Sequence, residues 1–149
     1  MTLPTGAISM SQVAAELGIS QTGLNLNHSW VRALAGQNSG PISMSNLQGQ
    51  TGNLDGNLTI QGGPVYFVNM NNPFFRGTIS GMTQDTSNNL TMSFSATPNW
   101  NGNISVRNLS NGASATLTKQ NSTTWGLNSA PGVLTPTAGS VEHFQIFPA

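Results

Sequence analysis

Acidic residues and histidines would have to carry any acid–base or metal chemistry in this chain, and they are few. They are Glu16, Asp55, Asp85, Glu142, His28 and His143. A glycosidase needs two carboxyl groups facing each other across its substrate, and a metal site needs ligands at characteristic spacings. The two histidines lie far apart, and the chain has no cysteine and no G-x-S-x-G nucleophile motif. We therefore expect a protein that is not an enzyme and that holds no metal or cofactor.

Two tryptophans stand in segments suited to binding a sugar. Trp100 lies in TPNWNGN and Trp125 in STTWGLNS, each beside Asn and Gly near a predicted turn. An exposed aromatic ring stacks on a sugar ring while neighbouring amides, here Asn99 and Asn101, bond its hydroxyls. A β-sandwich also buries tryptophan in its core. Core packing is therefore the alternative interpretation for both rings.

The composition excludes several kinds of partner. Of 149 residues only 5% are charged, against a typical value of about 25%, and the formal net charge is +0. Four basic residues cannot build the stripe that nucleic acid requires, nor an electrostatic membrane anchor. No apolar run approaches the ~20 residues of a membrane span, and the first residues lack the pattern of a secretory signal. We expect a folded protein made in a cytoplasm, with a surface of hydroxyls and amides.

Residues 1–52 carry signals for short helices. The phrase GAISMSQV at Gly6 returns at Gly40 as GPISMSNL. In the first copy, Ser9 and Gln12 form a capping box, Ile8 and Val13 form a hydrophobic staple, and Gly18 ends the helix. The second copy repeats this design with Ser43, Asn46 and Leu47. Between the copies, Asn25 or Asn27 is expected to cap a helix that Gly36 closes.

Residues 53–149 change to the period of two that is typical of strands. Alternating segments separated by Asn- and Gly-rich turns predict strands at 56–61, 64–70, 90–96, 103–107, 113–119, 123–127 and 141–147. Short strands at roughly 8–12-residue spacing are the pattern of a sandwich. The predicted fold is therefore mainly β, an immunoglobulin-like antiparallel β-sandwich preceded by a short helical arm. A jelly roll or a small barrel is the second choice.

The arrangement of motifs in the first 49 residues resembles a segment of tailed-bacteriophage structural proteins, most often tail-tip and tail-fibre components. The resemblance lies in the two glycine-x-isoleucine-serine phrases, the ELG that ends the first helix and the VRALAG between them. The residues concerned are Leu3–Gly18, Val31–Gly36 and Ser39–Gly49. It implies a part of the virion, assembled from several copies of this chain together with other virion proteins.

The change of period divides the chain into residues 1–52 and 53–149. Helices of about two to three turns are marginal alone, so the first 52 residues are either a mini-bundle or an arm that folds on a partner. The resemblance implies that 1–52 is an attachment and oligomerisation arm and that 53–149 is a β domain displayed outward. The expected assembly contacts are Ile8, Val13, Leu17, Leu26, Trp30, Val31, Leu34, Ile42 and Leu47.

The expected function is a structural role in the tail, baseplate or neck, with an additional weak contact to host cell-surface polysaccharide. Two alternatives remain open. One is a carbohydrate-binding module that uses Trp100 and Trp125, and the other is a capsid decoration protein.

Overall fold

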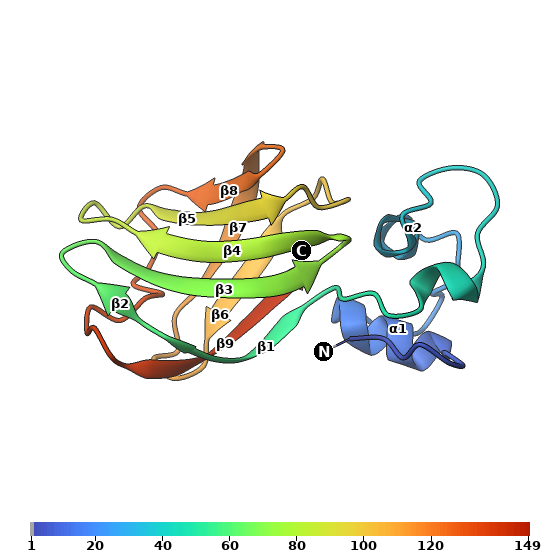
Figure 1. Cartoon of the computed structure of the whole chain (residues 1–149), viewed down its shortest axis with the longest axis horizontal. Helices are drawn as coiled ribbons and strands as arrows, with labels where there is room; N and C mark the ends of the chain where they lie inside the picture. Colours follow the sequence, from blue (N-terminus) through green and yellow to red (C-terminus); the bar gives the residue numbers. More distant parts are fainter. Residues whose placement is uncertain (1) are drawn as a thin grey trace.

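A computed structural model describes residues 2–149, which form a helical arm and a strongly curved β-sheet. The arm contains helix α1 (Met10–Leu17), helix α2 (Ser29–Ala35) and the 3₁₀-helix η1 (Met44–Leu47). The strands are β1 (Leu54–Thr59), β2 (Gln61–Gly62), β3 (Tyr66–Phe74), β4 (Gly77–Gln84), β5 (Leu90–Ala96), β6 (Ile104–Asn108), β7 (Ser114–Asn121), β8 (Thr124–Leu127) and β9 (Val141–Pro148). Figure 1 shows the arm beside one end of the sheet.

The repeated phrase folds as predicted, into two helix starts. The Ser9 N–H donates to Gln12 Oε1 at 2.8 Å, and the Gln12 N–H donates to Ser9 Oγ at 3.3 Å, which confirms the first capping box. In the second copy the Ser43 N–H donates to Asn46 Oδ1 at 2.9 Å. There the helix has only four residues, a single 3₁₀ turn.

Helix α2 corrects one prediction and confirms another. Its N-cap is His28, whose Nδ1 accepts from the Trp30 N–H at 3.1 Å, and not Asn25 or Asn27. Asn25 Oδ1 instead accepts from the Asn27 N–H and tightens the preceding turn. The helix ends at Gly36, which has a left-handed φ of 72°, as the sequence indicated.

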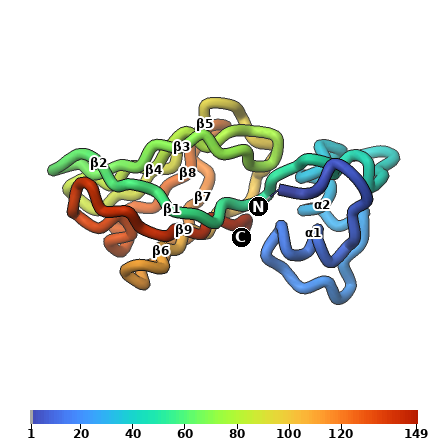
Figure 2. Tube along the Cα trace, turned by 60° about the horizontal axis from the view of Figure 1, so that its bottom comes forward, coloured from blue at the N-terminus to red at the C-terminus, as the bar shows by residue number. Residues whose placement is uncertain are grey.

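The nine strands of residues 2–149 form one continuous antiparallel sheet in the order β1-β9-β6-β7-β8-β5-β4-β3-β2. The sheet bends at strand β7, because residues 114–117 of this strand pair with β6 and residues 118–121 pair with β8. The sheet thus curls into a nearly closed barrel whose two layers appear in Figure 2. The mainly β, antiparallel prediction is confirmed. An immunoglobulin-like sandwich is not confirmed, because one sheet runs through both layers.

Strand β4 was missed by the sequence analysis, and β3 extends further than expected. Gly77 and Gly81 interrupt the alternation of β4, yet both are needed where backbones approach closely. A Cβ at Gly77 would lie 2.5 Å from the Ala96 carbonyl oxygen, and one at Gly81 would lie 2.6 Å from the Val68 carbonyl oxygen. Strand β4 therefore pairs with β3 on one side and β5 on the other.

A single hydrophobic core runs from the arm into the barrel. Leu17 and Leu34 of the arm belong to the same buried cluster as Phe75 and Trp100 at the near end of the barrel. The last helix of the arm ends at Leu47, and the first strand begins at Leu54. At the far end of the barrel, Val133 and Leu134 of the segment before β9 are buried. The Gln84 side chain holds this segment, because its Nε2 donates to the Pro131 carbonyl and its Oε1 accepts from the Leu134 N–H.

Candidate functional site

The candidate site is a groove where the arm meets the barrel, and polar bonds fix its two sides. The Arg76 guanidinium, at the turn between β3 and β4, donates to the carbonyls of Asn46 at 2.8 Å and Leu34 at 3.3 Å. Asn38 and Asn99 form a reciprocal amide pair with two N···O distances of 3.0 Å. These bonds hold the arm in one position on the barrel.

A buried carboxylate joins α1 to the segment that enters the barrel. Glu16 is 1% exposed, and its Oε1 accepts from the Gly52 N–H at 2.8 Å. Asn53 Nδ2 donates to the Glu16 carbonyl at 2.7 Å. Burial raises the pKa of the Glu16 carboxyl, against the opposing effect of the bond from Gly52. Glu16 therefore positions the arm and lies away from the groove lining.

The groove has a volume of about 630 Å³ and is lined from both parts of the chain. Trp30 of α2 and Trp100 of the β5–β6 connection meet edge to face, with ring centroids 5.1 Å apart and planes at 85°. Asn27 and Ser39 lie on the arm side, and Asn101 lies on the barrel side. This is an aromatic surface surrounded by exposed amides and hydroxyls.

A second hollow of about 370 Å³ borders the first. Ser29 and Trp30 line both hollows, and the second continues along the arm past Leu24 and His28. The two hollows therefore adjoin at Ser29 and Trp30. Trp30 is the aromatic residue that both linings share.

The groove carries little charge. Among the described residues that line the two hollows, Arg32 is the one with a permanent charge. Its Nε donates to Asn27 Oδ1 at 2.9 Å, and its Nη1 donates to the carbonyls of Gln37 and Gly40 at 3.0 Å. Most of its donors are thus already used in shaping the arm. The groove offers hydrogen bonds without a strong electrostatic field.

The predicted sugar-stacking rings are buried. Trp125 is 0% exposed and its Nε1 donates to the Gly102 carbonyl, while Trp100 is 4% exposed and its Nε1 donates to the Asn103 carbonyl, both at 2.9 Å. Phe94 packs on Trp125 and Phe75 packs on Trp100. Neither ring offers a free face to a sugar. Their burial confirms core packing, the other interpretation of both tryptophans, and corrects the sugar-stacking one.

The two amides that were predicted beside these rings have different positions. Asn99 is half-buried and bonds the arm, with its Nδ2 donating to the Ala33 carbonyl at 2.8 Å. Asn101 is exposed in the groove, and its Oδ1 accepts from Lys119 Nζ at 2.6 Å. Asn101 alone of the four candidate sugar-binding residues is thus both exposed and part of the groove lining.

The expected assembly contacts fall into two groups. Val13, Leu17, Val31, Leu34 and Leu47 are 0% exposed within the chain itself. They cannot contact another molecule while the chain is folded, so the assembly role expected for them is corrected to packing within the chain. The others remain partly exposed at the border of the core, namely Ile8, Leu26, Trp30 and Ile42.

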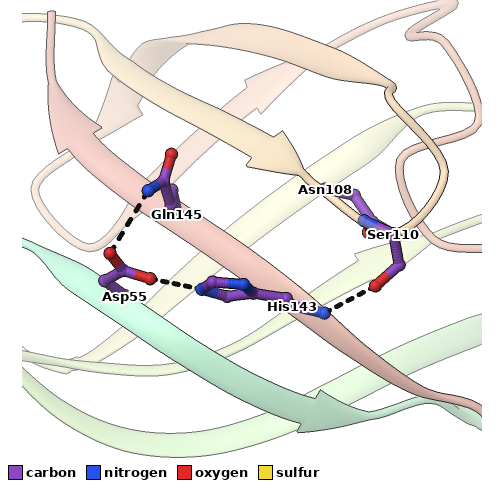
Figure 3. A network of polar contacts seen from close by, with 5 residues as sticks. All are labelled: Asp55, Asn108, Ser110, His143 and Gln145. Atoms are coloured by element: carbon purple, nitrogen blue, oxygen red, sulfur yellow. Dashed lines mark hydrogen bonds and ion pairs between the residues drawn. The ribbon is translucent and has the colours of Figure 1, made fainter.

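A polar cluster on the outer face of β1 and β9 resembles a catalytic triad in composition only (Figure 3). The His143 ring bonds Asp55, and Gln145 Nε2 donates to the other carboxylate oxygen at 3.2 Å. Ser110 Oγ, however, accepts from the His143 main-chain N–H at 2.9 Å. In a serine hydrolase the hydroxyl bonds the imidazole, so this geometry is not that of an activated nucleophile. The bond from His143 lowers the pKa of the Asp55 carboxyl.

Metal binding and membrane spanning are two further roles that residues 2–149 could have. No group of three or more His, Asp or Glu side chains there is placed to hold a metal ion. No helix in that range is long and apolar enough to span a bilayer. Neither finding adds a second candidate site to the groove.

Comparison with known proteins gives no further guide, because no family model, no curated protein and no solved structure matches the chain. The groove itself was not foreseen from the sequence. Its arm side comes from residues 27–40, where the sequence predicts only a helix and a connection. The signal available was the cluster of Asn and Ser around Trp30.

Proposed function

We propose that this protein is a non-enzymatic structural component of a tailed bacteriophage particle, attached through its arm, with the barrel displayed outward. The observation that carries the proposal is the distribution of partly exposed apolar side chains. Among residues 2–149, nine of the fourteen such side chains that border the core lie in the arm, although the arm is about a third of the chain. They are Ile8, Met10, Ile19, Leu24, Leu26, Trp30, Ala33, Ile42 and Met44.

The composition of the surface supports the same proposal. With four basic and four acidic residues in the whole chain, neighbouring copies would repel each other very little. Apolar side chains at the border of a core are the usual material of a protein–protein contact. We propose the arm as the contact with further copies of this chain and with other virion proteins. We also propose that the barrel, whose two layers face each other, serves as an immunoglobulin-like display domain.

The test of location is mass spectrometry of purified phage particles produced by the host that carries this gene. The proposal predicts peptides of this chain in the particles at a stoichiometry comparable to that of other virion proteins. Antibody labelling in the electron microscope then separates the tail, baseplate or neck from the capsid surface, where a decoration protein would lie. Absence of the chain from washed particles would refute a virion role.

The test of assembly uses the partly exposed arm residues. Ile8→Ser and Ile42→Ser, combined, should lower the oligomer mass measured by light scattering, because they remove apolar contact area without opening the core. Leu109→Ser is the matched control, since Leu109 is 43% exposed on the barrel. Equal masses for both variants would exclude the arm as the site of self-association.

A further inference from the structure

We propose that the groove between the arm and the barrel binds a neutral oligosaccharide, with Trp30 as the ring on which one sugar unit stacks. This inference goes beyond the structural role, and it requires that Trp30 stays outside the contact proposed for the arm. Trp30 replaces the two buried tryptophans as the aromatic of the site. It is the one tryptophan of the described chain that remains partly exposed.

The shape of the groove fits a chain of sugars better than a single compact ligand. The two hollows, of about 630 and 370 Å³, share Ser29 and Trp30 and so adjoin at these two residues. Each is of the size that holds a small-molecule ligand. A linear oligosaccharide laid across Trp30 would fill both at once.

The chemistry of the lining selects an uncharged, hydroxyl-rich ligand. Asn27, Ser29, Ser39 and Asn101 bring exposed amides and hydroxyls to the rim. These groups donate and accept hydrogen bonds, as sugar hydroxyls do, and carry no charge. The guanidinium of Arg32 is already bonded to three oxygens of the arm, so it is a poor anchor for a phosphate or a carboxylate.

The groove is organised before any ligand arrives. The Trp30 ring meets the Trp100 ring edge to face, with centroids 5.1 Å apart, and meets the His28 ring edge to face at 6.2 Å, so its position is set from two sides. The Asn38–Asn99 amide pair, itself part of the groove lining, joins the arm to the barrel. Binding a ligand therefore costs little conformational entropy in the site, which favours measurable affinity from few contacts.

The experiment titrates the full chain with three neutral probes, maltohexaose, cellohexaose and chitohexaose, and follows the indole N–H signals by NMR. At least one probe should shift the Trp30 signal at millimolar concentration and leave the signal of buried Trp125 unchanged. A heparin hexasaccharide serves as the anionic comparison and should bind more weakly. No shift of Trp30 with any neutral probe, or preferential binding of the anionic one, would overturn the proposal.

Variants assign the binding to the groove. Trp30→Ala should weaken binding of the active probe about tenfold, on the scale of one aromatic contact. Asn101→Ala removes a rim amide whose bond from Lys119 lies on the exposed surface, and about a fivefold loss of affinity is expected from one hydrogen bond. Asn57→Ala, an exposed amide on β1, is the matched control and should bind like the unmodified chain. If Trp30→Ala fails to fold, Asn101→Ala decides, and unchanged affinity there refutes the groove.

Discussion

The arm and the barrel are held together by different kinds of interaction. In the barrel, antiparallel main-chain ladders join every strand to a neighbour. In the arm, helices α1 and α2 have only eight and seven residues, and side chains bond main-chain groups of distant segments. Glu16 and Asn53 bond in this way beneath α1, and Arg76 bonds the end of α2.

This difference shows where the stability of the arm comes from. Helices of this length are marginal in water, so α1 and α2 must be stabilised by packing. Their buried leucines lie in one cluster with Phe75 and Trp100 of the barrel. The helices of the arm are therefore stabilised by packing against the end of the barrel. Four substitutions test this difference between arm and barrel.

The largest effect is expected from Leu34→Asp. Leu34 is 0% exposed in the cluster that joins arm and barrel, and an unpaired charge there should cost more than about 4 kcal/mol. Loss of soluble folded protein, or a collapse of the melting temperature in circular dichroism, is the expected result. Leu109→Asp, on the exposed barrel surface, should melt within about 0.5 kcal/mol of the unmodified chain.

Arg76→Ala should loosen the arm more than the barrel. Arg76 is exposed, but its two bonds to the carbonyls of Leu34 and Asn46 tie the arm to the β3–β4 turn. Their loss should cost about 1–2 kcal/mol. Amide hydrogen exchange should accelerate in residues 30–47 and stay slow in β4 and β5. Arg107→Ala on β6 is the control, and similar acceleration in that variant would contradict a specific tie.

Glu16→Gln tests the buried carboxylate. Burial raises the pKa of Glu16 above its ordinary value of 4.5, so the folded state binds the proton more tightly than the unfolded state. Stability contributed by this group is present below pH about 4.5 and is lost as the pH rises through the raised pKa. Between pH 4.5 and 7.5 the unmodified chain should therefore lose more melting temperature than Glu16→Gln. Parallel curves of melting temperature against pH would show that folding does not raise the pKa of Glu16.

The smallest effect is expected on the barrel surface, at Asp55. Its pKa is lowered from 3.8 by the bond from His143, so its contribution is present above that value and is lost as the pH falls through the lowered pKa. Both side chains are 41% exposed, and the pair should contribute no more than about 0.5 kcal/mol. Asp55→Asn should flatten the acid limb of the stability curve slightly, as followed by urea unfolding at pH 2–5. A change larger than that of Arg76→Ala would reverse the order proposed here.

Local signals were predictable from the sequence, and contacts between distant segments were not. The capping box at Ser9 and the left-handed glycine at Gly36 depend on residues three or four positions apart, and both were found as expected. Strand β4 was missed because Gly77 and Gly81 interrupt its alternation of polar and apolar residues. Both glycines are needed where the backbone of a neighbouring strand approaches closely, and local sequence does not show such an approach.

The candidate site shows the same limit. The local sequence around a tryptophan near Asn and Gly does not show whether its ring is exposed or buried. Trp125 and Trp100 are buried because Phe94 and Phe75 pack against them. The groove depends on residues 27–40 meeting residues 99–102, a contact with no counterpart in the local pattern. The role of Trp30 therefore required the fold.

The most direct test of the account is thermal unfolding of the whole chain and of residues 53–149 alone. If the arm and the barrel end form one core, the whole chain unfolds in a single transition. The fragment, with Phe75 and Trp100 uncovered, should then melt at least about 10 °C lower. A fragment that melts at the temperature of the whole chain would contradict this account and make the arm a separate appendage.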